Sequence, residues 1–383
     1  MPEPMPDAPP HPLAASPIGQ LQPIPEGVLA YVPDPLPRSL QLPPDVVYLL
    51  DEASREVATL AGVGETLLNP RLLIAPFLRL EAVLSSRIEG TQASLSDVYV
   101  FEAGGREPAD AREVWNYVQA VEHGLARLDA LPISLRLLLE LHELLLTGVR
   151  GSSLHPGELR DRQVWLGAAG TPIARARYVP PPPRALIELL ADWERFVHDD
   201  GPLPPLVRAA LMHYQFEAVH PFIDGNGRIG RLLIPLLLAE RGVLRTPLLY
   251  LSAYFERRRP EYYDQLLAVS HSGDWTPWLR FFLLGVRDQA RDALRRARTL
   301  RDLHEHYRAL LQERRAAASV LQLLDELFVR PVFTRRHAAD RLGVTVVATR
   351  AIIDRLEAAG IVAPVADTYP QLFRADELLA ALG

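Results

Sequence analysis

Apolar residues recur at spacings of three and four through residues 45–150, as in VVYLLDEASREVATLAGV and RLLLELHELLLTGV. This spacing places the apolar side chains on one face of a helix, so it predicts a series of amphipathic helices. The same period returns in RALIELLADWERFV and continues to about residue 285. The pattern therefore predicts an all-α fold over most of the chain.

Two segments depart from the helical pattern. Residues 1–44 hold fourteen of the 35 prolines, whose fixed φ and missing N–H groups favour an extended, partly disordered arm over a packed element. Residues 163–180, QVWLGAAGTPIARARYVP, place short β-prone runs on either side of an Ala/Gly/Thr/Pro stretch. This second segment predicts a β-hairpin with a long loop, ended by the prolines that follow it.

The C-terminal part of the chain has a pattern of its own. An arginine-rich helix over residues 286–315 is most simply a solvated face that crosses between domains. Residues 316–383 then show three short helical runs, with Gly343 in the second turn, followed by a β-prone stretch, IVAPVADTYPQLFRA. This order predicts a winged helix-turn-helix domain.

Composition narrows the classes of protein that fit. A net charge of −6 over 383 residues argues against a protein that coats nucleic acid. The chain has no cysteine, which excludes disulfides, zinc–thiolate sites and thiol catalysis, and no lysine, which excludes a P-loop lysine or a Schiff base. Because no secretory leader pattern and no apolar run of 18 residues occur, we expect a cytoplasmic protein with no membrane association.

Residues 220–231 read HPFIDGNGRIGR and contain glycines in the order G-x-G-x-x-G, which is also the spacing of a dinucleotide-binding fingerprint. That fingerprint follows a strand, and an acidic residue ends a second strand about 20 residues later. Here the preceding run has a helical period, and the segment about 20 residues beyond Gly230, TPLLYLS, has no acid. The sequence therefore argues against a dinucleotide-dependent oxidoreductase.

The same stretch instead has the features of a phosphate site. Arg228 and Arg231 share a face near the start of a helix, where cations oppose the helix dipole, so a bound anion explains them better than helix stability does. Asp224 is a single carboxylate, which suits Mg²⁺ that takes its other ligands from phosphates and water. His220 precedes a proline, which leaves its imidazole in a loop, placed to take a proton from an incoming hydroxyl. A histidine that only caps structure is the alternative.

At these residues the chain resembles the Fic family, whose motif H-P-F-x-D-G-N-G-R-x-x-R is matched at every fixed position by residues 220–231. The resemblance implies an N-terminal helical domain over residues 45–134, a Fic (Fido) core over residues 135–285 with a flap at residues 163–180, and a C-terminal winged helix. It also implies transfer of AMP from Mg-ATP to a Ser, Thr or Tyr hydroxyl of a target protein, with release of pyrophosphate. The Doc branch, which phosphorylates, carries lysine where this chain has Gly227, so the comparison favours nucleotidyl transfer.

The resemblance assigns roles within the motif. It implies that His220 is the general base, that Asp224 holds Mg²⁺ through the α- and β-phosphates, and that Arg231 reaches the γ-phosphate. Phe222 would anchor the loop, and Arg228 would bind phosphate. The remaining implied nucleotide contacts are Pro221, Ile223, and the anion hole of Gly225, Asn226 and Gly227.

A second stretch, SSRIEGT at residues 85–91, matches the inhibitory motif of the family, [S/T]-x-x-x-E-[G/N]. Ser85 and Glu89 are four residues apart and so share a helical face, and Glu89 lies at a predicted helix C-terminus, where a carboxylate is unfavourable. The resemblance implies that Glu89 pairs with Arg231, excludes the productive γ-phosphate position and, as in some relatives, supports removal of AMP. A solvated surface glutamate is the alternative.

The adenosine end of the site is less sharply marked. Tyr254 and Arg258, at helical spacing in SAYFERRRPEYY, and Tyr263 beyond them are candidates for stacking or ribose contacts. Gln215, five residues before His220, is a candidate for the adenine edge. Core packing or a solvated basic face explains these residues equally well.

The partners follow from the two outlying modules. The resemblance implies that the edge of the flap at residues 163–180 binds an extended segment of the target protein by β-augmentation. The expected recognition helix, TVVATRAIIDRLEAAG, supplies only Arg350 and Arg355 beside two acids, which is weak for DNA binding. We therefore favour target recruitment or a homodimer for the winged helix. The rival hypothesis is a DNA-binding regulator whose Fic core senses nucleotide.

Overall fold

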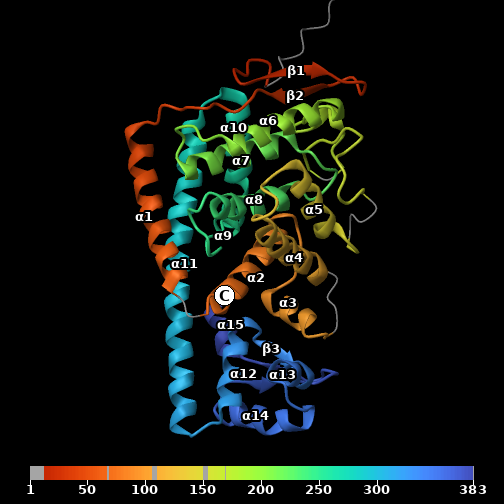
Figure 1. Ribbon diagram of the computed structural model, residues 1–383. Helices are drawn as coiled ribbons and strands as arrows, with labels where there is room; N and C mark the ends of the chain where they lie inside the picture. The colour runs from red at the N-terminus through yellow and green to blue at the C-terminus, as the bar shows by residue number, and fades with distance from the viewer. Residues whose placement is uncertain (1–12, 67–68, 106–109, 150–153, 169, 383) are drawn as a thin grey trace, which may run out of the picture.

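The structure is a computed structural model, and it describes residues 13–66, 69–105, 110–149, 154–168 and 170–382. It is mostly helical, and a single helix of 39 residues, α11 (Trp275–Glu313), runs along nearly the whole length of the molecule. The helices of the larger lobe pack beside one half of α11, and the C-terminal elements pack beside the other half (Figure 1).

The larger lobe is built around α7 (Pro205–Val219) and α8 (Asn226–Glu240). Apolar residues occur on every side of both helices, and nearly every residue of each is buried. A helix that is apolar all round must lie in the interior, so this pair forms the centre of the lobe. The surrounding helices are α4 (Ala111–Arg127), α5 (Leu135–Leu146), α6 (Leu186–His198), α9 (Ser252–Arg257) and α10 (Arg259–Ser272).

The N-terminal segment differs from the extended arm that its prolines predicted. Strands β1 (Gly19–Pro23) and β2 (Leu29–Pro33) form an antiparallel hairpin that packs over the end of the larger lobe (Figure 1). Ala30 and Tyr31 are completely buried, and the Tyr31 N–H donates a hydrogen bond of 2.9 Å to the carbonyl of Val179. The prolines fall at strand ends, where no ladder donor is lost, so they permit this hairpin. Residues 1–12 of the expected arm lie outside the described residues.

The expected arginine-rich helix is the second half of α11, and its arginines are not simply solvated. Helix α1 (Pro44–Thr66) packs along α11 and supplies acids at matching positions. Arg287 pairs with Glu52 at 3.1 Å, and Arg291 pairs with Glu56 at 2.8 Å. These ion pairs join the two long helices across their contact.

The flap segment at residues 163–180 is not the β-hairpin that the sequence predicted. Its ends meet in a single antiparallel bridge between Leu166 and Tyr178, with a short 3₁₀ helix, Ile173–Arg175, in the loop between them. The run of prolines from Pro180 removes the donors that a longer ladder needs. The Val179 carbonyl pairs with β2 instead, so tertiary contacts take the place of the expected ladder.

The C-terminal lobe contains α12 (Ala318–Val329), β3 (Val332–Thr334), α13 (Arg335–Leu342), α14 (Val346–Ala358), β4 (Ala363–Pro364), β5 (Leu372–Arg374) and α15 (Asp376–Leu382). Its strands form an antiparallel sheet in the order β3-β5-β4. Gly343 ends α13 at φ 64°, a left-handed position that favours glycine and turns the chain towards α14. The winged-helix assignment stays a prediction.

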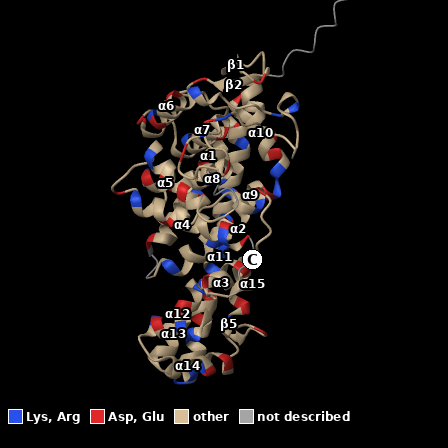
Figure 2. Cartoon of the chain, turned by 90° about the vertical axis from the view of Figure 1, so that its right-hand side faces the viewer, with Lys and Arg blue, Asp and Glu red and all other residues tan. Residues whose placement is uncertain are grey.

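Charges are dispersed over both lobes. Basic and acidic residues alternate along the helices, with no long stretch of one sign (Figure 2). Within the described part of the chain, no helix is both long and apolar enough to cross a membrane.

Candidate active site

The loop between α7 and α8 turns sharply at two left-handed positions. His220 ends α7 with φ 49° and ψ 61°, and its N–H donates to the carbonyl of Phe216 at 3.0 Å. Gly225 precedes α8 with φ 82°, which only glycine adopts without strain. Glycine suits its position at one end of the loop, whereas a left-handed backbone is uncommon for a histidine and is held here by the contacts of the loop.

Asn226 holds this loop together from inside. Its side chain accepts a hydrogen bond from the Phe222 N–H at 2.9 Å and donates to the Phe222 carbonyl at 2.8 Å. The Phe222 ring is fully buried and stacks on His142, with ring centroids 3.8 Å apart and planes 10° apart. His142 also contacts the Asp224 carbonyl through Nε2 at 3.1 Å. The side chain of Asn226 thus shapes the loop, and its backbone N–H is the part that faces an anion.

Arg160 fastens the loop from the other side. Its backbone N–H donates to the Pro221 carbonyl at 3.0 Å, and its Nε donates to the His220 carbonyl at 2.8 Å. Arg160 is 3% exposed, and it supplies both donors: its backbone N–H to the Pro221 carbonyl and its guanidinium to the His220 carbonyl. Neither Arg160 nor His142 was identified from the sequence, because nothing local to either residue marks its contact with a loop far along the chain.

The loop borders a cavity of about 720 Å³. Helix α8 begins at Asn226, so the N–H groups of its first turn have no acceptor within the helix and are available to an anion. The motif residues that line the cavity are His220, Ile223, Asp224, Gly225, Asn226 and Gly227. The remaining lining comes mainly from the flap segment and from α10.

The imidazole of His220 is held neutral. Burial, together with the nearby guanidinium of Arg160, lowers the pKa of His220 to about 4. Its Nδ1 lies 3.3 Å from the Glu217 carbonyl, a contact that favours the proton on Nδ1 and leaves Nε2 as the basic nitrogen. A neutral imidazole with a free nitrogen is the form that a general base requires.

Arg231 meets the residues of the second motif. Helix α2 (Arg71–Ile88) carries Ser85 in its last turn, and Glu89 follows directly as its C-cap. Arg231 donates through Nη2 to Glu89 Oε1 at 2.7 Å, through Nε to Ser85 Oγ at 2.9 Å, and again through Nη2 to the Ser85 carbonyl at 2.9 Å. Burial alone would raise the pKa of Glu89, but Arg231 lowers it overall, so the carboxylate is ionised. The structure therefore forms the pair that the sequence suggested, through one carboxylate oxygen.

Gly227 makes the approach of Glu89 to α8 possible. A Cβ added at Gly227 would collide with Glu89 Oε1 and would lie 2.8 Å from Arg231 Nη1. Nη1 of Arg231 is itself buried and has no hydrogen-bond partner among the described residues. Buried guanidinium donors are normally satisfied, so this nitrogen is a further site for an anionic oxygen.

Asp224 and Arg228 lie differently from one another. Asp224 lines the cavity. Among the described residues, its Oδ1 accepts a hydrogen bond from the Gly225 N–H at 2.6 Å and lies 3.6 Å from the guanidinium of Arg228. The other oxygen is thus placed for a cation, although no group of three or more metal-binding side chains occurs among the described residues. Arg228 is buried and points towards Glu113 at 3.5 Å, so it does not line the cavity as a phosphate contact would.

Three of the expected adenosine contacts lie outside the cavity. Tyr254 is 3% exposed and packs on Phe281, with Arg258 stacked over its ring at 4.3 Å from the centroid. Gln215 is buried and donates to the Asp34 carbonyl at 3.0 Å. The expectation for these residues is corrected: Tyr254 and Gln215 are buried in packing contacts, and Arg258 is an exposed arginine stacked on Tyr254, uses that local spacing does not distinguish from a ligand contact.

Tyr263, the fourth of these candidates, does line the cavity, together with other residues on one face of α10. Tyr263, Leu266, Leu267 and Ser270 line it. Their positions are i, i+3, i+4 and i+7, a pattern that marks one helical face and was visible in the sequence. Glu217, also in the lining, was missed; burial raises the pKa of its carboxyl to about 7, and its Oε1 has no hydrogen-bond partner in the described structure.

Comparison with known proteins gives the family. Residues 47–126 match the Fic/DOC family N-terminal model, and residues 132–238 match the Fic/DOC family model. The chain is 34% identical over 151 residues to a protein named protein adenylyltransferase Fic of Drosophila yakuba, a match that covers 39% of this chain and 27% of that protein. The chain is also 34% identical, over 153 residues, to the protein of the same name from Drosophila grimshawi. The chain thus spans about a quarter of the length of these relatives.

Solved structures show the same fold. A Fic family protein from Desulfovibrio desulfuricans superposes with a TM-score of 0.58 at 23% identity, over 88% of this chain and 97% of that one. Fic-1 from C. elegans superposes with a TM-score of 0.50 at 25% identity, over 66% of this chain and 73% of that one. Residues 47–126 and 132–238 of this chain thus match the two Fic/DOC family models, and six residues of the motif line the cavity just described.

Proposed function

We propose that the protein is a protein adenylyltransferase, which transfers AMP from ATP to a Ser, Thr or Tyr hydroxyl of a target protein. The observation that carries this proposal is the convergence, on one cavity of about 720 Å³, of the neutral imidazole of His220 and the open N-terminus of α8. A base beside a phosphate site is the arrangement that nucleotidyl transfer to a hydroxyl needs. The name of the Drosophila relatives supports the same activity.

The residues divide the chemistry between them. The N–H groups at the start of α8 would bind phosphate oxygens, and the α10 face with Tyr263 would receive the adenosine. His220 Nε2 would take the proton of the target hydroxyl while the hydroxyl oxygen forms a bond to the α-phosphorus of ATP. The bond between the α-phosphorus and the oxygen that bridges to the β-phosphorus would break, and pyrophosphate would leave with that oxygen. Mg²⁺, held by Asp224 and by phosphate oxygens, would supply neutralising charge.

We propose that Glu89 restrains this reaction. Its carboxylate lines the cavity and accepts from Arg231 Nη2 at 2.7 Å, whereas Arg231 itself is 2% exposed and is not part of the lining. A γ-phosphate that needs Arg231 must displace Glu89, and two anions cannot share that position without a large electrostatic cost. The same carboxylate, beside a bound AMP-modified target, is placed to assist the reverse reaction, removal of AMP.

The flap segment is the proposed docking site for the target. Trp165 and Leu166 are exposed there, with 42% and 36% of their surface accessible, next to the mouth of the cavity. The Val179 carbonyl is already paired with β2, and both backbone groups of Leu166 are paired with Arg177 and Tyr178. The backbone that we propose for β-augmentation is therefore that of Trp165. We assign the C-terminal lobe to target recruitment or homodimer formation in the cytoplasm, since Arg350 and Arg355 are a small basic surface for DNA.

Label transfer from α-labelled ATP with Mg²⁺ tests the proposal. We expect weak self-labelling of the wild type, strong self-labelling of Glu89→Gly, and none in Glu89→Gly with His220→Ala. Arg87→Gly is the matched control, because Arg87 lies in the same helical turn and is exposed, away from Arg231. If Glu89→Gly binds ATP but no label from the α-phosphate reaches itself or added proteins, the proposal is wrong.

A second assay separates the rival hypothesis. A DNA-binding regulator would bind duplex DNA with an affinity that falls steeply as salt rises, and Arg350→Gln with Arg355→Gln would weaken it. We expect no such binding. Salt-dependent DNA binding together with absence of AMP transfer would favour the rival.

A further inference from the structure

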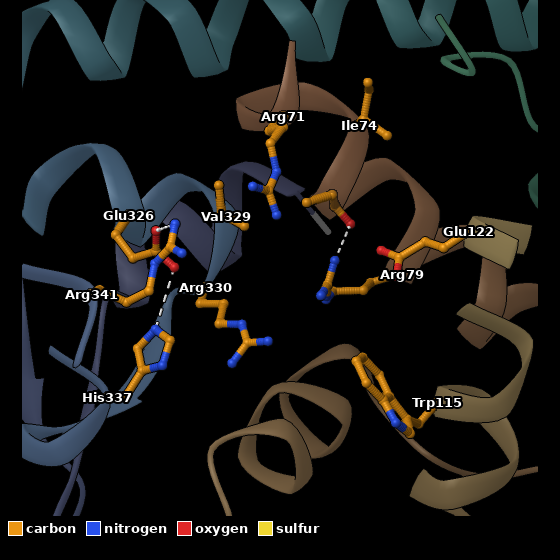
Figure 3. Close-up of a pocket in the computed structure, with 11 residues that line it drawn as sticks. Arg71, Ile74, Arg79, Trp115, Glu122, Glu326, Val329, Arg330, His337 and Arg341 are labelled. Carbon is orange, nitrogen blue, oxygen red and sulfur yellow. Dashed lines mark hydrogen bonds and ion pairs between the residues drawn. The ribbon is translucent and has the colours of Figure 1, made fainter. Parts of the chain in front are cut away.

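A second cavity, of about 330 Å³, lies where the two lobes meet (Figure 3). Its walls come from α2 and α4 of the larger lobe and from α12, α13 and the residue between α12 and β3 in the C-terminal lobe. The lining residues that bear charge are Arg71, Arg79, Glu122, Glu326, Arg330, His337 and Arg341. It shares no lining residue with the active-site cavity.

The lining has an excess of positive charge, only part of which is neutralised. Arg79 is 3% exposed and is satisfied by Glu102, with contacts of 2.6 and 2.9 Å. Glu326 is shared by Arg341 at 2.7 Å and by His337 at 3.3 Å. Two of the four arginines are thereby paired. Glu122, also in the lining, offsets part of the charge of the other two, which are at least partly exposed to solvent.

Those two are Arg71 and Arg330. The Nε of Arg330 lies 3.8 Å from Glu102, whose two oxygens already accept from Arg79. In the described part of the chain, the guanidinium of Arg71 has no carboxylate within ion-pairing distance. Figure 3 shows both side chains reaching into the same space, one from α2 and the other from the C-terminal lobe.

Like charges drawn into one cavity repel each other, and an anion between them removes that cost. Guanidinium groups offer paired donors whose geometry matches the oxygens of a phosphate. Trp115, which lies on the opposite wall in Figure 3, adds an apolar ring face beside this cationic wall. The volume is at the lower end of the range for small-molecule sites.

We propose that this cavity binds a small phosphate-bearing ligand, with the phosphate between Arg71 and Arg330 and the organic part against Trp115. Arg341, which pairs with Glu326 at 2.7 Å, lines the cavity from α13. Because Arg71 belongs to α2 and Arg330 to the C-terminal lobe, the ligand bridges the two lobes. It would therefore hold together two surfaces that otherwise meet around a cluster of like charges.

Isothermal titration with inorganic phosphate and with ribose 5-phosphate tests the proposal and distinguishes a bare anion from a phosphate ester. We expect the double variant Arg71→Gln, Arg330→Gln to bind at least tenfold more weakly than the wild type. Arg336→Gln is the matched control, because Arg336 is an exposed arginine of α13 that does not line the cavity, and its binding should be unchanged. Arg71→Lys with Arg330→Lys keeps the charge and serves if the first double variant does not fold.

Hydrogen exchange gives the position of the ligand independently of any activity. Ribose 5-phosphate should slow amide exchange in both the N-terminal half of α2 and in α13, and should do so less in the double variant. Protection confined to the active-site loop, or equal affinity of the double variant and the wild type, would overturn the proposal. Tighter binding of ribose 5-phosphate than of phosphate would confirm that the Trp115 side contributes.

Discussion

Replacing Asn226 with alanine should loosen the active-site loop without unfolding the protein. Asn226 is 2% exposed, and its side chain makes two hydrogen bonds, of 2.9 and 2.8 Å, to the N–H and the carbonyl of Phe222. The variant leaves both backbone groups without these partners. We therefore expect the loop, which carries His220 and Asp224, to open more often.

The magnitude follows from the two lost partners. Each buried backbone group left unsatisfied costs about 1–3 kcal/mol, and water from the adjoining cavity reduces this cost. A total of about 2–4 kcal/mol is reasonable, and since every 1.4 kcal/mol is a factor of ten, local opening should become roughly 30- to 1000-fold more frequent. Nucleotide affinity should fall as well, because the N–H groups at the start of α8 lose their fixed position.

Amide exchange at Phe222, followed by NMR or by mass spectrometry of the loop peptide, measures this opening directly. The control is Asn116→Ala, because Asn116 also donates two hydrogen bonds to backbone, to Leu145 at 3.2 Å and to Thr147 at 2.8 Å, outside the loop. It should leave exchange at Phe222 unchanged. If Asn226→Ala also leaves it unchanged, our account of what holds the loop is refuted.

Three further predictions concern Glu217, Gly227 and the contact between α1 and α11. Burial raises the pKa of Glu217 to about 7, so the folded state holds this proton more tightly than the unfolded chain, and stability falls as pH rises from about 4.5 to 7. Urea unfolding should therefore show Glu217→Gln more stable than the wild type by about 1–3 kcal/mol at pH 8, with little difference at pH 4.5; equal gains at both pH values would contradict this. Gly227→Ala should strengthen ATP binding in a titration, because its Cβ collides with the Glu89 carboxylate and displaces it from Arg231; unchanged affinity would show that Glu89 adjusts without leaving Arg231. Arg291→Gln should cost about 1 kcal/mol or less in urea unfolding, since the arginine side chain of its pair with Glu56 is 42% exposed, and a larger loss would reveal a tighter network.

The site was predictable from the sequence where its geometry is local. The proline after His220 predicts that α7 ends there, and Gly225 has the residue type that its left-handed turn needs, so the ends of the loop follow from the order of residues. The left-handed backbone of His220 itself does not. The Glu89–Arg231 contact joins residues 142 positions apart. The spacing of residues within each motif did not predict that contact. The prediction came from the family resemblance alone.

The remainder depended on tertiary packing. Tyr254 and Tyr263 have the same residue type and neighbouring positions, yet one packs in the core and the other lines the cavity, because they lie on different helices, α9 and α10. The break between these helices at Arg258 is marked by Pro260 in the first turn of α10, a helix-start signal that the spacing argument for Tyr254 and Arg258 did not use. The proline content of residues 13–44 predicted an extended arm, but the prolines of this hairpin lie at strand ends. They therefore do not prevent the Ala30–Val32 segment from pairing and being buried.

Because α11 is one continuous helix, the rotation of the C-terminal lobe relative to the larger lobe depends on the number of residues in that helix. Its 39 residues extend about 58 Å at 1.5 Å per residue, and elements of both lobes pack against it. One residue inserted between the parts that contact α1 and α12 would rotate the C-terminal lobe by about 100° about the helix axis, away from α2. Seven residues would nearly restore the orientation but would shift that lobe by about 10 Å along the axis. Natural or engineered changes in the length of this helix therefore decide whether the two halves of the arginine-lined cavity face each other at all.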